Sequence, residues 1–195
     1  MSSELFFSCL TSLLISMALI PPLRLLADRF RFVDLPGERK VHQHPVPSIG
    51  GIAFAIGSFA SILWWCPQDQ IKFSVLLGGL IILGFGVWDD RIDLGYKVKL
   101  LGQLLAALVI VFVGGIRFES IPVFSNAELP MWIGAPLTVF FLVAVSNAGN
   151  LADGLDGLAG GLSFLTLCGI AYLAYLSKDS IVLLLTVPFL GGVLG

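Results

Sequence analysis

Long apolar segments separated by short polar ones dominate the chain. A helix that crosses the hydrocarbon of a bilayer needs about 20 mostly apolar residues. The sequence holds six segments of this kind, and a seventh begins near Ser180 and continues to Gly195. The pattern predicts an all-α, polytopic transmembrane helix bundle with six full spans and a truncated seventh. The predicted spans cover residues 5–23, 49–66, 71–88, 98–116, 131–149 and 157–177.

The composition supports this prediction and limits the classes of protein to consider. Hydrophobic residues make up 57% of the chain, charged residues make up 12%, and the mean hydropathy is +0.97, values that are unusual for a soluble domain. No internal repeat or low-complexity tract divides the sequence. We therefore expect one integral membrane domain over residues 1–195, with the lipid bilayer as its surroundings. The net charge of −2 gives no indication of a nucleic-acid partner.

The positions of Lys and Arg predict the orientation of the spans. Basic residues in short loops remain on the cytoplasmic side. They are concentrated between the first and second spans and between the third and fourth, which places the N-terminus outside. Glu4 precedes the first apolar segment and Arg24 follows it, a pattern typical of a retained anchor. The basic residues of the two cytoplasmic loops are Arg24, Arg29, Arg31, Arg39 and Lys40, then Arg91, Lys97 and Lys99.

Two adjacent carboxylates, Asp89 and Asp90, close the third predicted span. The helix dipole is negative at this end, and the carboxylates repel each other, so a compensating cation is expected. Lys97 and Lys99 could supply that charge as a solvated ion-pair patch. A magnesium ion that bridges the carboxylates to a phosphate is the alternative.

Two asparagines and two aspartates recur at every third position between the fifth and sixth spans. On a continuous helix such residues fan over half the circumference, so one ligand could not meet all of them. The glycines among them predict a break in the helix that would let the polar groups converge on a metal, base or sugar. A simple N-cap role explains Asp153 equally well. The four residues are Asn147, Asn150, Asp153 and Asp156.

The first cytoplasmic loop carries a basic group suited to phosphate recognition. Its members are Arg39, Lys40, His42 and His44. The general excess of basic residues in cytoplasmic loops explains the same group without a ligand.

Three motifs together resemble the polyprenyl-phosphate N-acetylhexosamine-1-phosphate transferases. The first is DLPGERKVHQHPVPSIGG at residues 34–51. The second is the Asp89–Asp90 pair followed by Lys99 and by QLLAA at residues 103–107. The third is NAGNLADGLDGLAGG at residues 147–161. The motifs occur in the family's order, and the resemblance covers nearly the whole chain.

The resemblance implies an enzyme of the bacterial inner membrane with its active site on the cytoplasmic face. Such enzymes move a sugar 1-phosphate from a UDP-sugar to undecaprenyl phosphate and release UMP. They require magnesium, for which manganese is an alternative. The form of the first motif favours UDP-N-acetylglucosamine, or a related UDP-N-acetylhexosamine, as the donor in an O-antigen or teichoic-acid type of pathway. The resemblance leaves a homodimer open.

Family resemblance also assigns expected roles to individual residues. Asp89 and Asp90 correspond to the catalytic acidic pair, which deprotonates the lipid phosphate or helps to hold the metal. Asp153 and Asp156 are further metal candidates. Direct attack by the lipid phosphate is the expected mechanism. The substrate-binding set consists of Asn147, Asn150, Asp153, Asp156, Lys40, His42 and Lys99.

Complete members of the family continue with a GD-containing motif that supplies a metal-binding aspartate, and then with a His-rich loop. Neither follows within these 195 residues, so we expect the chain to be the N-terminal part of a longer transferase and to be inactive alone. A non-catalytic membrane subunit or pseudoenzyme remains an alternative. A small transporter is a weaker one, because transporters place their binding groups near the midplane of the membrane.

Overall fold

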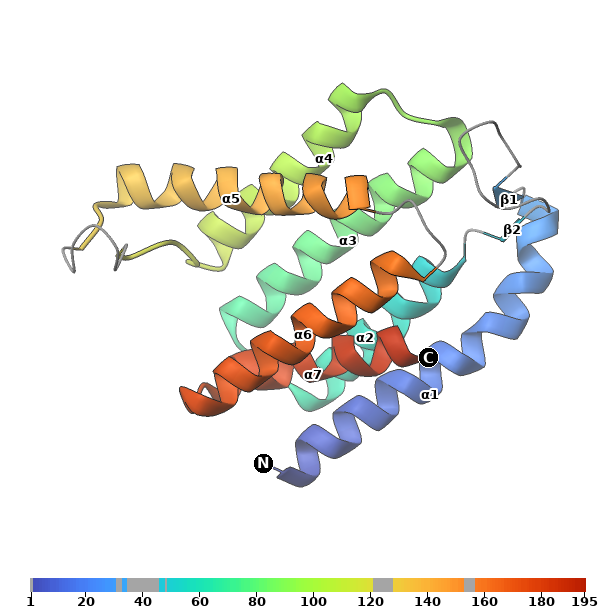
Figure 1. Cartoon of the computed structure of the whole chain (residues 1–195), viewed down its shortest axis with the longest axis horizontal. Coiled ribbons are helices and arrows are strands. Elements are labelled where there is room, and N and C mark those ends of the chain that lie inside the picture. Colours follow the sequence, from blue (N-terminus) through green and yellow to red (C-terminus); the bar gives the residue numbers. More distant parts are fainter. Residues whose placement is uncertain (1, 31–32, 35–45, 48, 121–127, 153–156) are drawn as a thin grey trace. The chain divides into compact units, whose positions relative to one another are not determined.

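The computed structural model describes residues 2–30, 33–34, 46–47, 49–120, 128–152 and 157–195. Within these ranges the chain forms seven α-helices, one π-helical segment and two short strands (Figure 1). The strands, β1 (Val33–Asp34) and β2 (Val46–Pro47), pair antiparallel and were not indicated by the sequence pattern. The helical elements are α1 (Ser2–Phe30), α2 (Gly50–Trp65), α3 (Gln70–Ile92), α4 (Tyr96–Leu108), η1 (Val109–Val113), α5 (Met131–Ala152), α6 (Leu158–Leu176) and α7 (Ser180–Leu194).

Each apolar segment of the sequence has become a helix, which confirms the all-α bundle. In the described part of the chain, five helices are long and apolar enough to cross a bilayer. They lie in α1, α3, α4 with η1, α5 and α6. α2 has only 16 residues, or about 24 Å at 1.5 Å per residue, against a hydrocarbon thickness of about 30 Å. The second predicted span is therefore present as a helix, although not at full spanning length.

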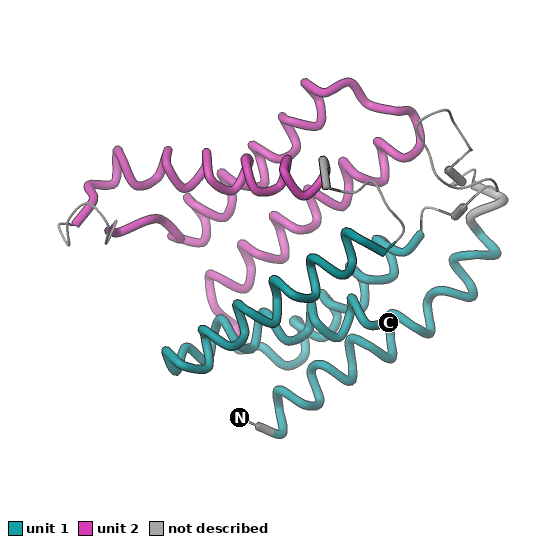
Figure 2. The backbone as a smooth tube through the Cα atoms, in the orientation of Figure 1, with its two compact units in different colours: residues 1–67, 153–195 teal, residues 68–152 magenta. Residues whose placement is uncertain are grey.

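The chain divides into two compact units (Figure 2). The first unit combines residues 1–67 with residues 153–195. In it, α7 packs against α1, α2 and α6, and α1 also packs against α2. Helices separated by most of the sequence are therefore neighbours in this unit.

Small side chains make the close packing of the first unit possible. Ser8, Ser12 and Ser16 recur every fourth residue along one face of α1 and are fully buried. The Ser61 hydroxyl of α2 donates to the Ser8 carbonyl at 2.7 Å. A methyl group at Gly191 of α7 would collide with the backbone of α1. Such small residues are typical of helix contacts in membranes, because no apolar driving force exists between helices in lipid.

The second unit, residues 68–152, is built from α3, α4, η1 and α5. α4 packs against both α3 and α5. Gly102 of α4 lies against the Phe85 ring of α3, so that a Cβ atom there would be 2.5 Å from the ring. One π turn, with the Gly114 amide donating to the Val109 carbonyl at 3.1 Å, extends this helix.

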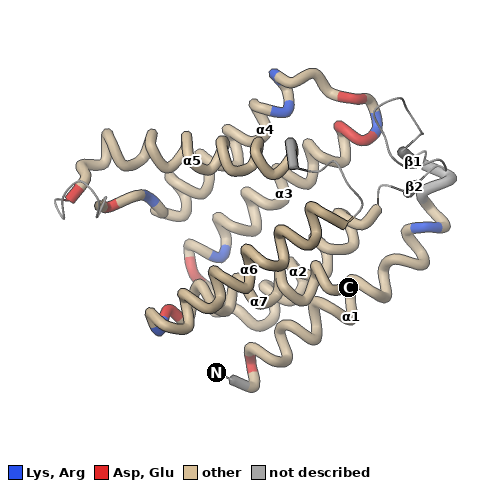
Figure 3. Tube along the Cα trace, viewed as in Figure 1, with Lys and Arg blue, Asp and Glu red and all other residues tan. Residues whose placement is uncertain are grey.

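A short turn joins α3 to α4 and brings charged side chains together. Asp93 ends α3 with a φ of 49°, which reverses the direction of the chain, and α4 begins after Gly95. Figure 3 shows the charged residues of this unit near the ends of its helices, including this turn. The charged residues of α3 and α4 therefore lie together at this turn. The candidate site lies at the same end of the two helices.

Candidate functional site

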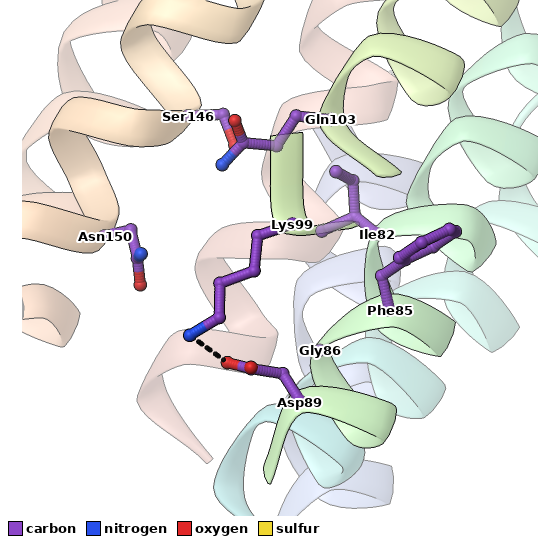
Figure 4. Close-up of a pocket in the computed structure, with 8 residues that line it drawn as sticks. All are labelled: Ile82, Phe85, Gly86, Asp89, Lys99, Gln103, Ser146 and Asn150. Atoms are coloured by element: carbon purple, nitrogen blue, oxygen red, sulfur yellow. Dashed lines mark ion pairs between the residues drawn. The ribbon is translucent and has the colours of Figure 1, made fainter. Parts of the chain in front are cut away.

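A pocket of about 200 Å³ lies inside the second unit, among α3, α4 and α5 (Figure 4). It contains a carboxylate, an ammonium group, two amides and a hydroxyl beside apolar side chains. Because all of its walls come from one compact unit, these helices define its geometry. The lining residues are Ile82, Phe85, Gly86, Asp89, Lys99, Gln103, Ser146 and Asn150.

Helical periodicity explains why these residues share one cavity. Residues four apart lie one above the other on a helix face. Lys99 and Gln103 are related in this way on α4, as are Ser146 and Asn150 on α5. The pocket consequently has a charged level with Asp89 and Lys99, and a neutral polar level with Gln103 and Ser146 (Figure 4).

The Asp89 carboxylate is held by two different donors. The backbone N–H of Leu94 donates to Oδ1 at 2.8 Å, across the turn that ends α3. The Lys99 ammonium lies 2.9 Å from Oδ2. The exposed fractions of the Lys99 and Asp89 side chains are 33% and 27%, so a ligand could still reach both charges. The backbone contact fixes one oxygen and leaves the other for exchange between Lys99 and a ligand.

The structure also selects between the two lysines that the sequence offered. Residues two apart on a helix point in nearly opposite directions. Lys99 reaches Asp89, whereas Lys97 is exposed and lies over the Tyr96 ring at 5.9 Å. Lys99 is also 3.8 Å from Asp93, whose side chain is fully exposed. The compensating cation predicted for this helix end is therefore Lys99.

Two other predicted residues are described but do not line the pocket. Asp90 follows Asp89 on α3, so its side chain is rotated by about 100° and is exposed. Asn147 is exposed on α5, while Asn150 faces the pocket. α5 continues through Gly149 to Ala152, so the predicted break does not occur at that glycine. It is confirmed at Gly157, which precedes α6 with a φ of 77°.

The remaining predicted residues, Lys40, His42, Asp153 and Asp156, lie outside the described residues. Two of the four carboxylates proposed to bind the metal, Asp153 and Asp156, are among these residues, so the structure does not describe the full ligand set. Among the side chains that the structure describes, no group of three or more His, Cys, Asp or Glu could hold a metal ion. The proposed magnesium site thus stays a prediction.

Gln103 and Ser146 line the pocket, although no sequence pattern singled them out individually. Gln103 appeared only within the QLLAA segment. The signal that could have identified it is its position one helical turn after Lys99, on the same face. Ser146 similarly precedes Asn150 by one turn on α5. Both spacings become informative once Lys99 and Asn150 are known to face a cavity.

The fold and the pocket together define a class: a helical membrane protein with a small polar site at the charged end of apolar helices. Within that class, the chain belongs to glycosyl transferase family 4, which it matches over residues 72–195. This match includes the whole pocket.

Individual relatives have names that describe related transfers. The chain is 36% identical over 188 residues to a probable undecaprenyl-phosphate N-acetylglucosaminyl 1-phosphate transferase of Bacillus subtilis, covering 95% of this chain and 52% of that protein. It is 33% identical over 175 residues to a decaprenyl-phosphate N-acetylglucosaminephosphotransferase of Mycobacterium tuberculosis, covering 84% and 43% respectively. It is also 33% identical over 166 residues to a phospho-N-acetylmuramoyl-pentapeptide-transferase of Lactobacillus gasseri, covering 76% and 51%. The chain therefore spans about half the length of these curated relatives.

Proposed function

We propose that the protein containing this chain transfers N-acetylhexosamine 1-phosphate from a UDP-sugar to a polyprenyl phosphate and releases UMP. The observation that carries the proposal is the Asp89–Lys99 pair, which lines a pocket among three apolar helices, at the charged end of two of them. A lipid phosphate has its charge at the membrane boundary and its tail in the hydrocarbon. A charged pocket that opens among apolar helices suits such a substrate.

The residues of the pocket supply complementary parts of this chemistry. In the proposed reaction, an oxygen of the lipid phosphate attacks the phosphorus that bears the sugar, and the bond from that phosphorus to the UMP oxygen breaks. UMP leaves with the bonding electron pair. The Lys99 ammonium would offset negative charge that develops on the phosphoryl oxygens. Asp89 would accept the proton of a monoprotonated lipid phosphate or hold a cation.

Magnesium is part of the proposal, and the donor set agrees with it. Mg²⁺ in phosphoryl-transfer sites is bound through one or two carboxylates together with substrate phosphates and water. Asp89 Oδ2 and the amide oxygen of Asn150 are hard oxygen ligands that line one pocket. When bound, the ion would draw negative charge from the diphosphate. Lys99 would then pair with a phosphate in place of Asp89.

Undecaprenyl phosphate and UDP-N-acetylglucosamine are the substrates we propose. The Bacillus subtilis relative, whose name specifies N-acetylglucosamine, shares 36% identity, against 33% for the muramoyl-pentapeptide relative. The sequence motif at residues 34–51 favours the same branch. We further propose that the turn between α3 and α4 faces the cytoplasm of a bacterial cell, because basic residues surround it.

The test is UMP release by the full-length protein purified from its native membrane. We expect release that requires both UDP-N-acetylglucosamine and polyprenyl phosphate, and that stops when divalent cations are chelated. Asp89→Asn should reduce the rate by about 100-fold or more, because it removes a charge in the reacting site. Asp93→Asn is the matched control, since Asp93 is near the same lysine but fully exposed.

Different results would favour the other hypotheses. Full biological activity of the Asp89→Asn variant would indicate a non-catalytic membrane subunit. Uptake of a solute into sealed vesicles without UMP release would indicate a transporter. Either result would overturn the proposed transfer.

A further inference from the structure

A buried acceptor at the neutral polar level of the pocket has no hydrogen-bond partner among the described residues. Gln103 Oε1 is inaccessible to solvent and accepts no hydrogen bond from the described part of the chain. Its side chain extends from α4 toward Ser146 of α5, on the far side of the pocket from Asp89 (Figure 4). The Ser146 hydroxyl nevertheless donates no hydrogen bond to it. Within the described residues, a polar atom beside the pocket therefore lacks a hydrogen bond.

An unsatisfied acceptor of this kind is unfavourable. Buried carbonyl oxygens in proteins almost always accept a hydrogen bond, and each exception calls for an explanation. A methionine or leucine at this position would fill similar space without a group that needs a partner. Rotation of the Gln103 amide toward the cavity would expose Oε1, and a ligand that brings its own donor into the pocket would then satisfy it.

The chemistry of the acceptor limits what that ligand group can be. A carbonyl oxygen requires an O–H or N–H donor. Deprotonated phosphate and diphosphate oxygens have only lone pairs, and an isoprenoid tail has no polar hydrogen. The one O–H of a monoprotonated lipid phosphate is assigned to Asp89 in the proposed reaction. A nucleotide sugar carries several suitable donors, namely the hydroxyls of both sugars, the acetamido N–H and the uracil N–H.

We infer that Gln103 is a binding residue that accepts a hydrogen bond from a hydroxyl or N–H of the sugar nucleotide. This inference rests on the proposed function. Lys99 precedes Gln103 by one turn, so the two side chains leave α4 about 6 Å apart along the helix axis. If a phosphate of the ligand pairs with Lys99, the neutral part of the same ligand would lie within reach of Gln103, at the neutral polar level. The two levels of the pocket would then bind the charged and the neutral parts of one substrate.

Gln103→Met in the full-length protein tests this role. It keeps the length of the side chain and removes the amide. Gln70→Met is the matched control, because Gln70 is exposed at the start of α3 in the same unit. We expect Gln103→Met to weaken UDP-N-acetylglucosamine binding by about 10-fold, measured by calorimetry, as for one lost hydrogen bond. The control should bind as the wild type does.

Stability and kinetics separate a binding role from a structural one. If Gln103 only meets the substrate, Gln103→Met should melt at or above the wild-type temperature without ligand. Its KM for UDP-N-acetylglucosamine should rise, while the KM for polyprenyl phosphate stays constant. A lowered melting temperature with unchanged affinity for UDP-N-acetylglucosamine would overturn the inference.

UDP alone identifies the part of the ligand that Gln103 meets. If Gln103→Met weakens UDP and UDP-N-acetylglucosamine equally, the contact is to the uridine, and if it weakens only the latter, the contact is to the sugar. Wild-type affinity of the variant for both would overturn the inference even if UMP release proceeds. Binding of UDP-N-acetylglucosamine by the wild type without UMP release would instead overturn the proposed transfer.

Discussion

Asp89 and Lys99 meet at 2.9 Å across the turn that connects α3 and α4. Asp89 is at the end of one apolar helix and Lys99 is in the first turn of the next. The pair therefore joins two helices at the end where their backbone changes direction, and it does so in a pocket that a ligand can reach.

Removal of the Lys99 charge should impair phosphate binding more than stability. The pair is partly exposed, so its contribution to the free energy of unfolding is at most about 1 kcal/mol. We expect Lys99→Met to raise the KM for a phosphate-bearing substrate by about 10-fold or more, because a charge-assisted contact is lost. Lys99→Arg should raise this KM less, because it keeps the positive charge. Steady-state kinetics and thermal melting would check both effects, and unchanged kinetics for Lys99→Met would restrict the pair to a structural role.

The two oxygens of Asp89 should have separable roles. Asp89→Asn keeps an acceptor for the Leu94 amide, whereas Asp89→Ala leaves that N–H without its partner. We expect Asp89→Ala to be less stable than Asp89→Asn by about 1 kcal/mol. Chemical denaturation in detergent micelles would measure this difference. Equal stabilities of the two variants would contradict the proposed fixing role of Leu94.

Gly102 should be intolerant of a methyl group. A Cβ atom at this position would be 2.5 Å from the Phe85 ring. Gly102→Ala should therefore lower the free energy of unfolding by about 1 to 3 kcal/mol through overpacking. Gly84→Ala is the control, because a Cβ there meets nothing within 4 Å, and it should stabilise α3 by up to about 1 kcal/mol. A Gly102→Ala protein as stable as the Gly84→Ala protein would contradict the described α3–α4 contact.

The serine face of α1 should contribute measurable hydrogen-bond energy. Ser61→Ala removes the 2.7 Å bond to the Ser8 carbonyl and should destabilise the protein by roughly 0.5–1 kcal/mol. Ser163→Ala, at an exposed position of α6, should have no measurable effect. Thermal melting of both variants in the same detergent would compare them. An equally small effect of Ser61→Ala would mean that packing alone holds α1 to α2.

The proposed orientation predicts which turns are accessible from outside the cell. With Cys9, Cys66 and Cys168 replaced by alanine, a single cysteine can be placed at Gly95 or Ser177, both of which are exposed. A membrane-impermeant maleimide should label Ser177→Cys in intact spheroplasts. It should label Gly95→Cys only after permeabilisation. Labelling of both positions from the same side would contradict the orientation.

The helices could be predicted from the sequence because long apolar segments have few other structures available in a membrane. The charged level of the site was also predictable, since Asp89 lies at a helix end that calls for a cation. By contrast, the choice of Lys99 over Lys97 depends on the direction in which the turn sends α4, which is set by the left-handed conformation of Asp93. No residue pattern before the turn specifies that direction.

The neutral level of the pocket could not be predicted, because it arises from tertiary packing. Gln103 and Ser146 belong to helices that are far apart in the sequence, and they share a cavity only because α4 packs on α5. The π-helical segment could not be predicted from the sequence either. Its residues, Val109–Val113, are apolar and β-branched or aromatic for the most part, as in many ordinary spans.

The π turn of η1 affects how this unit would respond to the loss of one residue. The residues of α4 and η1 that contact α3 recur at every fourth position. They are Gly102, Ala106, Ile110 and Gly114. In an α-helix of 3.6 residues per turn, each such step rotates the contact line by about 40°. The wider π turn winds more slowly and returns the line toward α3. Deletion of one residue among 111–113 would convert η1 to ordinary α-helix and shift only Gly114 and the residues after it. Deletion of one residue of α4 before Gly102 would turn all four contact residues away from α3.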